Sequence, residues 1–136
     1  MFTISNQSDY AMLFLEYLSR EKKSVSLAEV VEDLKLPRRF MAHVASKLVN
    51  AKILESREGV HGGYTLIKPL KKIKLSELLS LFEGDMKLVK CSDNSYECQW
   101  KNVCRHKNAW QHTLQKKFIA IIDSMSVADM MAKTAF

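Results

Sequence analysis

Cysteine is scarce in this sequence and confined to one place. All three cysteines, Cys91, Cys98 and Cys104, fall within the fourteen residues CSDNSYECQWKNVC. Disulfide bonds cannot use an odd number of thiols, because one is always left over. In a reducing compartment, clustered thiols more often hold metal or respond to oxidants than form structural disulfides. The cysteine content therefore excludes a disulfide-stapled scaffold and indicates a loop with its own chemistry.

Long apolar runs, targeting segments and enzyme motifs are also lacking. No stretch approaches the about 20 apolar residues of a membrane span. The start, MFTISNQSDYAM, has no basic region followed by an apolar run, so we expect a cytoplasmic protein without a membrane partner. No nucleophile–base pair or phosphate loop is visible, and we expect no enzyme. The 136 residues, 47% hydrophobic and 26% charged, predict one compact domain or a small domain with an extension.

Positive charge is concentrated in one block. The net charge is +6, yet residues 35–74 alone carry ten basic and two acidic side chains, a net charge of +8. Residues 1–34 have a net charge of −3 and residues 75–136 a net charge of +1. A local positive field of this size suits a polyanion such as DNA, because binding releases counterions from the phosphates. A solvated basic face without a partner is the simpler alternative.

The first half of the chain has the pattern of a helix-turn-helix. Apolar spacing predicts an amphipathic helix over 8–20, and Ser26 with Glu29 forms a capping-box signature for a second helix over 27–34. Pro37 suits the first turn of a third helix over 38–50. That helix begins with adjacent arginines, as the DNA-recognition helix (here also called the reading helix) of a helix-turn-helix would. Its polar side chains at the surface or its margins are Arg38, Arg39, His43, Ser46 and Lys47.

A glycine-tipped hairpin follows. The strand-like runs ILESR and YTLIK flank EGVHGG, whose glycines permit the positive φ angles of a tight loop. A helix pair followed at once by such a hairpin predicts a winged helix-turn-helix. The fold class we expect is mainly α with a small β-hairpin, a winged helix-turn-helix plus a long C-terminal dimerisation helix.

The second half predicts a helix over 75–83 that Gly84 ends, then the cysteine loop, then a long helix over 105–125. The apolar stripe of the long helix is most simply paired with its copy in a homodimer, and the alternative is a helix folded back on its own domain. SVADMMAK predicts a short final helix after Ser126. We therefore expect a DNA-binding domain over 1–84, a cysteine loop over 85–104, and a dimerisation helix with a C-terminal cap over 105–136.

The cysteine spacing, C-x6-C-x5-C, differs from the C-x2-4-C knuckles of structural zinc sites. Wider gaps suit a larger object such as an iron–sulfur cluster held by soft thiolates. Cys104 falls at the expected start of the long helix, where the dipole favours a thiolate. His106 and His112 are near enough in sequence to supply a fourth ligand. From the residues alone, a cluster, a zinc site and a metal-free thiol switch all stay open.

Taken together, these motifs resemble the IscR/NsrR/RirA family of winged-helix transcription regulators, which sense through an iron–sulfur cluster. The resemblance includes SDYAM in the first helix, GGYTL in the wing, the three-cysteine loop, the long helix and the SVADMM ending. It implies a DNA-binding regulator, which we expect to be a repressor, acting on double-stranded DNA at a palindromic operator. The signal it implies is nitric oxide, redox state or iron status, and the sequence does not choose among them.

By resemblance, Cys91, Cys98 and Cys104 would hold the cluster, either 4Fe–4S or 2Fe–2S. IscR-like members use a histidine three residues after the last cysteine, where this chain has Lys107, so His106 is one place out of register. NsrR-like members use an early aspartate from the partner subunit, and Asp9 falls at that position. Asp9 is therefore the preferred fourth ligand and His106 the alternative, while a first-turn carboxylate stabilised by the helix dipole is the simpler reading of Asp9.

Two departures from the family pattern affect the expected contacts. The residue before Gly59 is Glu58 where the family commonly has arginine, so wing contacts would rely on Arg57 and His61. The first cysteine gap is one residue longer than usual, which leaves the cluster type open. We expect Arg38, Arg39 and His43 to approach bases, and Ser46, Lys47 and Arg57 to lie nearer the DNA backbone. The alternatives are a regulator of the same fold that uses zinc or thiol oxidation, and an iron–sulfur carrier protein.

Overall fold

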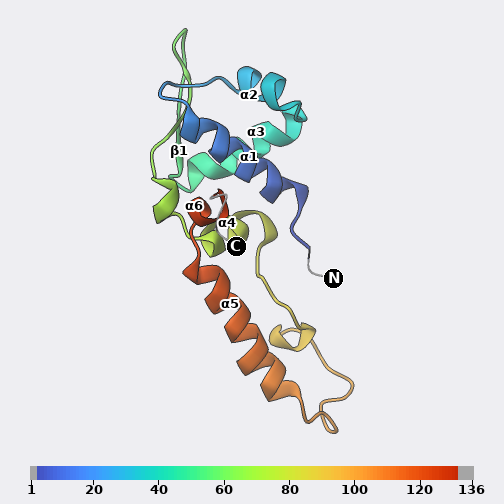
Figure 1. Cartoon of the computed structure of the whole chain (residues 1–136). Helices are drawn as coiled ribbons and strands as arrows, with labels where there is room; N and C mark the ends of the chain where they lie inside the picture. Colours follow the sequence, from blue (N-terminus) through green and yellow to red (C-terminus); the bar gives the residue numbers. More distant parts are fainter. Residues whose placement is uncertain (1–2, 132–136) are drawn as a thin grey trace.

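The chain folds into a helical body that carries a β-hairpin at one end and a long helix at the other (Figure 1). The computed structural model describes residues 3–131. In chain order the elements are α1 (Asn6–Arg20), α2 (Leu27–Leu34), α3 (Arg38–Asn50), β1 (Leu54–Arg57), β2 (Gly63–Leu66), η1 (Leu70–Lys72), α4 (Leu75–Glu83), η2 (Lys90–Ser92), η3 (Ala109–Leu114), α5 (Gln115–Ser124) and α6 (Val127–Met131). Within the described residues no helix is both long and apolar enough to cross a membrane.

The helix-turn-helix follows the predicted bounds of 27–34 and 38–50. The Ser26 hydroxyl accepts from the Glu29 amide at 3.2 Å while the Glu29 carboxylate accepts from the Ser26 amide at 3.0 Å, a complete capping box. Lys35 ends α2 in the left-handed conformation, with φ of 55°. Pro37 is the N-cap of α3, one place before the first turn where the sequence placed it. The buried face of α3 consists of Met41, Val44, Ala45 and Leu48.

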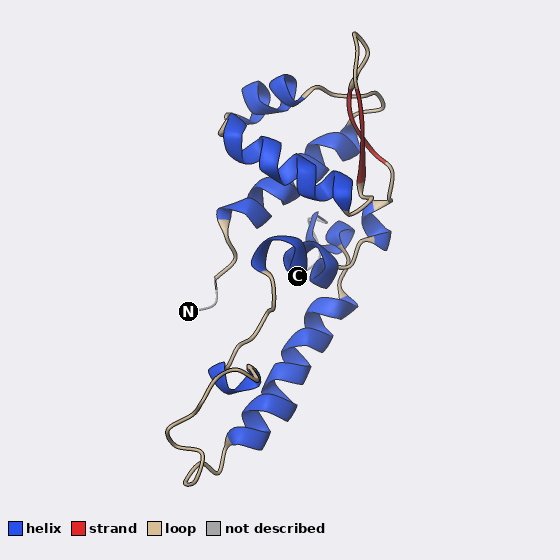
Figure 2. Cartoon of the chain, turned by 180° about the vertical axis from the view of Figure 1, so that it is seen from behind, coloured by secondary structure: helices blue, strands red, loops and turns tan. Residues whose placement is uncertain are grey.

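The wing is an antiparallel hairpin of β1 and β2, shown in red in Figure 2. Leu54 pairs with Leu66 at its base, and Arg57 pairs with Gly63 near its tip. Two hydrogen bonds between Val25 and Tyr64, at 3.1 and 2.8 Å, fasten β2 to the turn before α2. The wing is therefore held against the helix-turn-helix. These strands and their loop confirm the predicted winged helix-turn-helix.

One apolar core joins the winged-helix elements to the C-terminal segment. Phe14 of α1, Leu48 of α3 and Leu78 of α4 are fully buried in it together with Val127 of α6. The Val127 amide donates to the carbonyl of Ile73 at 2.8 Å. Residues 125–131, which the sequence grouped with the dimerisation helix, thus return to the body, and the end of SVADMMAK lies outside the described residues.

The long helix begins later than the predicted residue 105. Helical structure runs from 107 to 124, with π-helical hydrogen bonding over η3 and α-helical bonding over α5. Cys104 lies in the turn before the helix, so the predicted placement of this thiol at the helix start is wrong. Only the C-terminal part of the helix packs on the body, where a second apolar cluster contains Leu79, Met86 and Ile122. The remainder projects away from the body in both views (Figures 1 and 2).

Candidate functional site

The N-terminal turn of α3 carries two exposed arginines, Arg38 and Arg39, and no acidic residue. Cations at a helix N-terminus oppose the helix dipole, at a cost of about 0.3–1 kcal/mol each. Among residues 3–131, no acidic side chain forms an ion pair with either arginine. His43 and Ser46, one and two turns further along, are also exposed. This end of α3 therefore carries exposed positive charge without an ion-pair partner among the described residues.

Lys47 lies on a different side of α3. Its ammonium donates to the carbonyl of Leu81 at 3.0 Å and lies 5.4 Å from the centroid of the Phe82 ring. Its side chain therefore ties α3 to the last turn of α4. The structure separates it from the outward-facing group of Arg38, Arg39, His43 and Ser46.

The wing adds exposed side chains at the same end of the molecule as α3, opposite the tip of the long helix (Figure 1). Arg57 and His61 are exposed, as is Glu58. The Arg57 guanidinium lies 3.4 Å from a carboxylate oxygen of Glu55, an exposed ion pair worth little in water. Val60, at the wing tip, exposes 97% of its surface.

The three cysteines line a single cavity of about 670 Å³ between the loop and the start of the long helix. All three are free thiols of intermediate burial. Three aromatic side chains and three lysines share the lining with His106 and Glu97: the aromatics are Tyr96, Trp100 and Trp110, and the lysines are Lys90, Lys101 and Lys107. Iron–sulfur clusters are bound by soft thiolates, and the lysines would offset their negative charge, so the donor set is chemically suited to such a cluster.

The sulfurs share the cavity without being gathered on one point. Across the part of the chain that the structure describes, no group of three or more histidine, cysteine, aspartate and glutamate side chains is placed to hold a metal ion. His106 lines the cavity and its ring centroid lies 4.5 Å from that of Trp110. His112 and Asp9 are exposed and do not line it. Asp9 belongs to α1 in the body, so it could reach a cysteine cavity only in a second subunit.

Glu83, the last residue of α4, was not among the sequence candidates. One oxygen of its carboxylate accepts from the Ser5 amide at 2.8 Å, the Ser5 hydroxyl at 2.8 Å and the Ser8 hydroxyl at 2.5 Å. Partial burial raises the pKa of Glu83, but the hydrogen bonds from Ser8 and Ser5 outweigh it and leave the pKa below its ordinary value. No local sequence signal joins residues this far apart in the chain.

The comparisons with known proteins agree with this architecture. A family model named Rrf2 and described as an iron-dependent transcriptional regulator matches residues 4–133. The chain belongs to the Rrf2 family. As an Rrf2-family protein it is a transcriptional regulator rather than an enzyme, which confirms the prediction from the motifs.

Two relatives and one solved structure show the range of the family. The HTH-type transcriptional repressor NsrR of Streptomyces coelicolor is 28% identical over 104 residues, covering 76% of this chain and 69% of that protein. The regulator IscR of Cereibacter sphaeroides is 36% identical over 86 residues, covering 59% and 54% respectively. The fold matches that of CymR, the global cysteine regulator of B. subtilis, with a TM-score of 0.74 at 20% identity over 96% of both chains.

Proposed function

We propose that this chain is a homodimeric DNA-binding repressor whose operator affinity is set by an iron–sulfur cluster held in the cysteine cavity. The observation that carries the proposal is the position of that cavity. Three free thiols line one pocket at the N-terminal end of the long helix, and the C-terminal end of that helix packs on the winged helix-turn-helix body. The resemblance to IscR and NsrR supports the cluster over other thiol ligands.

Arg38 and Arg39 read bases in the major groove, with His43 beside them. Their guanidinium groups are exposed at the α3 N-terminus and each can meet two acceptors of guanine at once. Ser46 approaches the DNA backbone from α3, and Arg57 and His61 do so from the wing. Lys47 is left out of the interface because its ammonium is bound to the Leu81 carbonyl.

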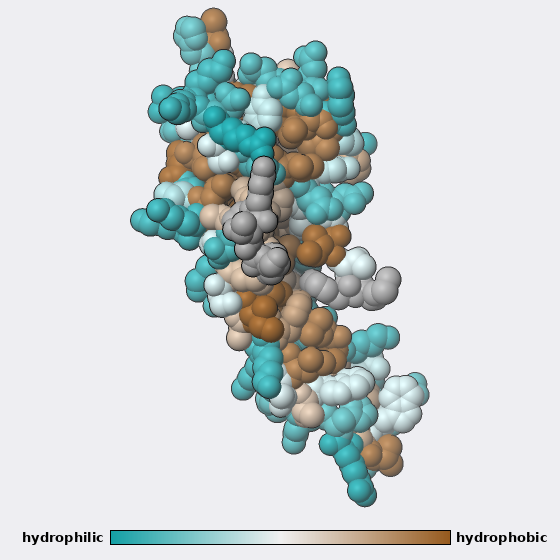
Figure 3. Space-filling view, in the orientation of Figure 1, coloured by the Kyte–Doolittle hydropathy of each residue, from teal (hydrophilic) through white to brown (hydrophobic). Residues whose placement is uncertain are grey.

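The long helix supplies the dimer contact. Trp110, Leu114 and Ile121 expose 47%, 49% and 60% of their surfaces along it. Brown hydrophobic surface continues from the body onto this helix in Figure 3. A second copy would cover these side chains and place two α3 helices for the half-sites of a palindromic operator.

Cys91, Cys98 and Cys104 would hold the cluster, with Asp9 of the second copy as fourth ligand and His106 as the alternative. Bound there, an iron–sulfur cluster supplies a redox-sensitive group that nitric oxide, oxidants or iron shortage can remove. The chain's own part is to provide thiolates, and Lys90, Lys101 and Lys107 along the lining stabilise their negative charge.

The last turn of α4 connects the cavity with the reading helix. Gly84, with φ of 69°, leads directly from α4 into the cysteine loop. The residues before it bind both neighbours, because the Leu81 carbonyl accepts from Lys47 of α3 and the Glu83 carboxylate accepts from Ser5 and Ser8 at the start of α1. The last turn of α4 is therefore joined to α3 and α1 by side-chain hydrogen bonds and continues directly into the cysteine loop.

The DNA contact is tested with Arg39→Ala. We expect it to weaken binding to a duplex selected by the wild-type chain from a random pool by about 1–3 kcal/mol, with a smaller loss on unselected DNA. Arg20→Ala, an exposed arginine on α1 outside the basic block, is the control. Both affinities are measured at one salt concentration, since phosphate contacts depend on salt. An equal loss on both duplexes would make Arg39 a phosphate contact.

The cofactor is tested by anaerobic purification. A coloured protein containing iron and acid-labile sulfide, which loses operator affinity when a chelator removes them, is the expected result. A colourless protein whose affinity ignores added iron and sulfide would refute the cluster. Cys98→Ala is compared with the wild-type chain, because Cys98 lines the cavity and lies far from α3 in the chain. This variant should hold less iron and sulfide.

A metal-free thiol switch is the second candidate. It is favoured by the free state of all three thiols and by the absence, among residues 3–131, of a ligand group placed to hold a metal. The structural likeness to the global cysteine regulator CymR fits this candidate as well. Zinc binding at the same thiols is distinguished from both by metal analysis. An iron–sulfur carrier has lost its support, because the family is one of transcriptional regulators.

A further inference from the structure

The segment between α4 and the first cysteine runs beside the long helix without belonging to a sheet or an α-helix. Its backbone groups need partners outside regular structure. Gln115 supplies two of them, because its amide oxygen accepts from the Leu88 amide at 2.7 Å and its amide nitrogen donates to the Met86 carbonyl at 2.7 Å. One side chain thus binds this segment as a neighbouring strand would.

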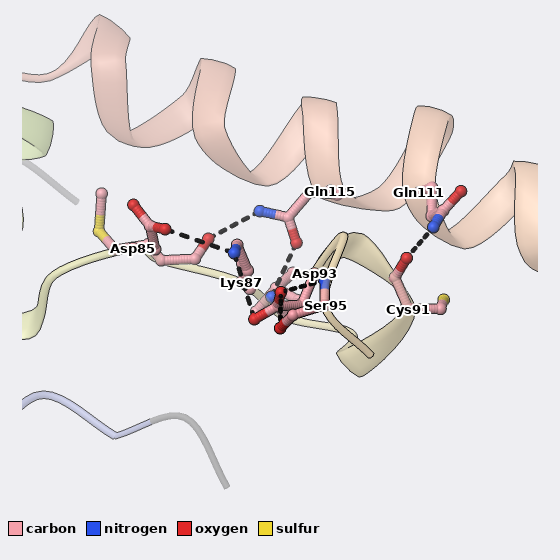
Figure 4. A network of polar contacts seen from close by, with 9 residues as sticks. Asp85, Lys87, Cys91, Asp93, Ser95, Gln111 and Gln115 are labelled. Carbon is pink, nitrogen blue, oxygen red and sulfur yellow. Dashed lines mark hydrogen bonds and ion pairs between the residues drawn. The ribbon is translucent and has the colours of Figure 1, made fainter. Parts of the chain in front are cut away.

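A second glutamine repeats the contact one turn earlier in the helix. The side-chain nitrogen of Gln111 donates to the carbonyl of Cys91 (Figure 4). Gln111 and Gln115 are four positions apart, so they project from the same face of the helix. Between them they hold the backbone of the segment from Met86 to Cys91.

Packing adds to the attachment, and two ion pairs join the segment to its own flanking residues. Met86 and Val89 expose only 8% and 9% of their surfaces. The Lys87 ammonium lies 3.3 Å from a carboxylate oxygen of Asp85 and 3.4 Å from one of Asp93, and so joins both ends of the segment (Figure 4). Asp93 in turn accepts from the amide and hydroxyl of Ser95, at 2.9 and 2.7 Å.

The other two cysteines are held differently. The hydrogen bonds around them are local backbone bonds, from the Lys101 amide to the Cys98 carbonyl at 3.4 Å and from the Cys104 amide to the Trp100 carbonyl at 2.9 Å. Within the described part of the chain, no hydrogen bond ties residues 96–104 to the long helix. Cys91 is fixed to that helix, whereas Cys98 and Cys104 belong to a separate stretch of loop.

We propose that Gln111 and Gln115 form a clamp that makes Cys91 the stationary thiol of the cavity, so that the stretch 96–104 is the part that moves when the cavity gains or loses its ligand. Both glutamines are positioning residues, since they bind the backbone around Cys91 and not the sulfur. The moving part of the proposal rests on the proposed function, because it needs a ligand at the thiols. The clamp itself does not.

The clamp is tested on the reduced, iron-free full-length chain by hydrogen exchange and alkylation. Gln115→Met should speed exchange of the Leu88 amide about fivefold, the protection of one net hydrogen bond. Gln111→Met should raise the alkylation rate of Cys91 relative to Cys98 and Cys104, which are internal references in the same molecule. Lys116→Met, at an exposed position of the same helix outside the clamp, is the control and should change neither rate.

Unchanged Leu88 exchange in Gln115→Met, or Cys91 reactivity that rises no more than that of the other thiols, would overturn the clamp. If Gln115→Met does not fold, Gln115→Glu replaces it. That variant keeps the acceptor for the Leu88 amide and sets an oxygen against the Met86 carbonyl, so Leu88 protection should persist while Cys91 alkylation rises. Loss of Leu88 protection in the folded glutamate variant would contradict the assignment.

The moving stretch is tested by adding iron and sulfide anaerobically to the wild-type chain. Amides in 96–104 should become more protected, while those of 86–91 change little. Equal gains in both stretches would refute the division into fixed and moving parts. If the wild-type chain takes up no iron, the proposed cluster is wrong, and the clamp is still decided by the iron-free measurements.

Discussion

Glu83 should contribute to stability far beyond an ordinary surface carboxylate. Its carboxylate receives three hydrogen bonds at the N-terminus of α1, and the Ser8 hydroxyl that supplies one of them is only 1% exposed. Ser5, the N-cap of α1, makes no side-chain bond to its own helix, so Glu83 takes the place of a local cap. A negative charge there also interacts favourably with the helix dipole.

The magnitude follows from what Glu83→Leu leaves behind. A buried hydroxyl without an acceptor costs about 1–3 kcal/mol, and the lost bonds from Ser5 to a charged group add about 1 kcal/mol, for a total of about 2–4 kcal/mol. Glu83→Gln keeps an oxygen acceptor and should cost less than half as much. Ser8→Ala removes the stranded hydroxyl, so the double variant Ser8→Ala/Glu83→Leu should be less destabilised than the sum of the single variants.

Urea denaturation of the wild-type chain and of the four variants measures these free energies of unfolding. Glu32→Leu, at an exposed position of α2, is the matched control and should change stability by less than about 0.5 kcal/mol. If Glu83→Leu is no worse than that control, or if the Ser8 and Glu83 effects simply add, the hydrogen bonds do not carry the energy assigned to them.

The same carboxylate gives a pH dependence of known sign. Because the folded pKa of Glu83 is lower than its ordinary value of 4.5, the folded state favours the ionised form. Its contribution is complete above the unfolded pKa and is lost as pH falls through the folded pKa. The stability difference between the wild-type chain and Glu83→Gln should therefore shrink in acid, and a difference that grows there would contradict the assignment.

Three further perturbations test other parts of the fold. Gly63→Ala should destabilise the wing by more than about 1 kcal/mol, measured by thermal unfolding, because a Cβ there would lie 2.5 Å from the Val25 carbonyl oxygen at a φ of 136°. Lys35→Gly should raise stability by about 1 kcal/mol in the same assay, since residue 35 has a φ of 55°. A hydrogen bond to Asp33 and partial burial raise the pKa of Tyr17 to about 12. Tyr17 therefore stabilises the folded chain fully below its ordinary pKa of 10.0, and this contribution is lost as the pH rises toward about 12. Tyr17→Phe should remove this pH dependence from the measured stability.

The elements that the sequence predicted well are those with local signals. The capping box at Ser26 and the positive φ of Gly84 mark helix ends through their nearest neighbours, and both ends were predicted correctly. The first helix begins at Asn6, two residues before the predicted start, and Glu83, 78 positions later than Ser5 in the chain, supports its N-terminus. That contact has no local signature, and apolar periodicity cannot detect it.

The candidate site divides in the same way. The exposed arginines of α3 follow from helical spacing, but the inward course of Lys47 depends on the carbonyl of Leu81 from a later helix. The sequence alone predicted that the three cysteines share one loop. It could not show that Gln111 and Gln115 would bind the backbone beside Cys91, because polar residues on a long helix are ordinarily solvated.

Several features break local rules for stability, and each lies on a surface that we propose for DNA or for a second copy of the chain. Arg38 and Arg39 oppose the dipole of α3, Val60 is an almost fully exposed apolar residue at the wing tip, and Ile121 is an exposed apolar residue on the long helix. A chain selected only for its own stability would replace all four, since each change is favourable in the isolated monomer. Phosphate groups near the α3 N-terminus would make the arginines favourable in the complex, although they oppose the helix dipole in the isolated chain. A second copy would bury the apolar surface of Ile121 and make that residue favourable as well. These violations therefore agree with the surfaces that we propose for DNA and for a second copy of the chain.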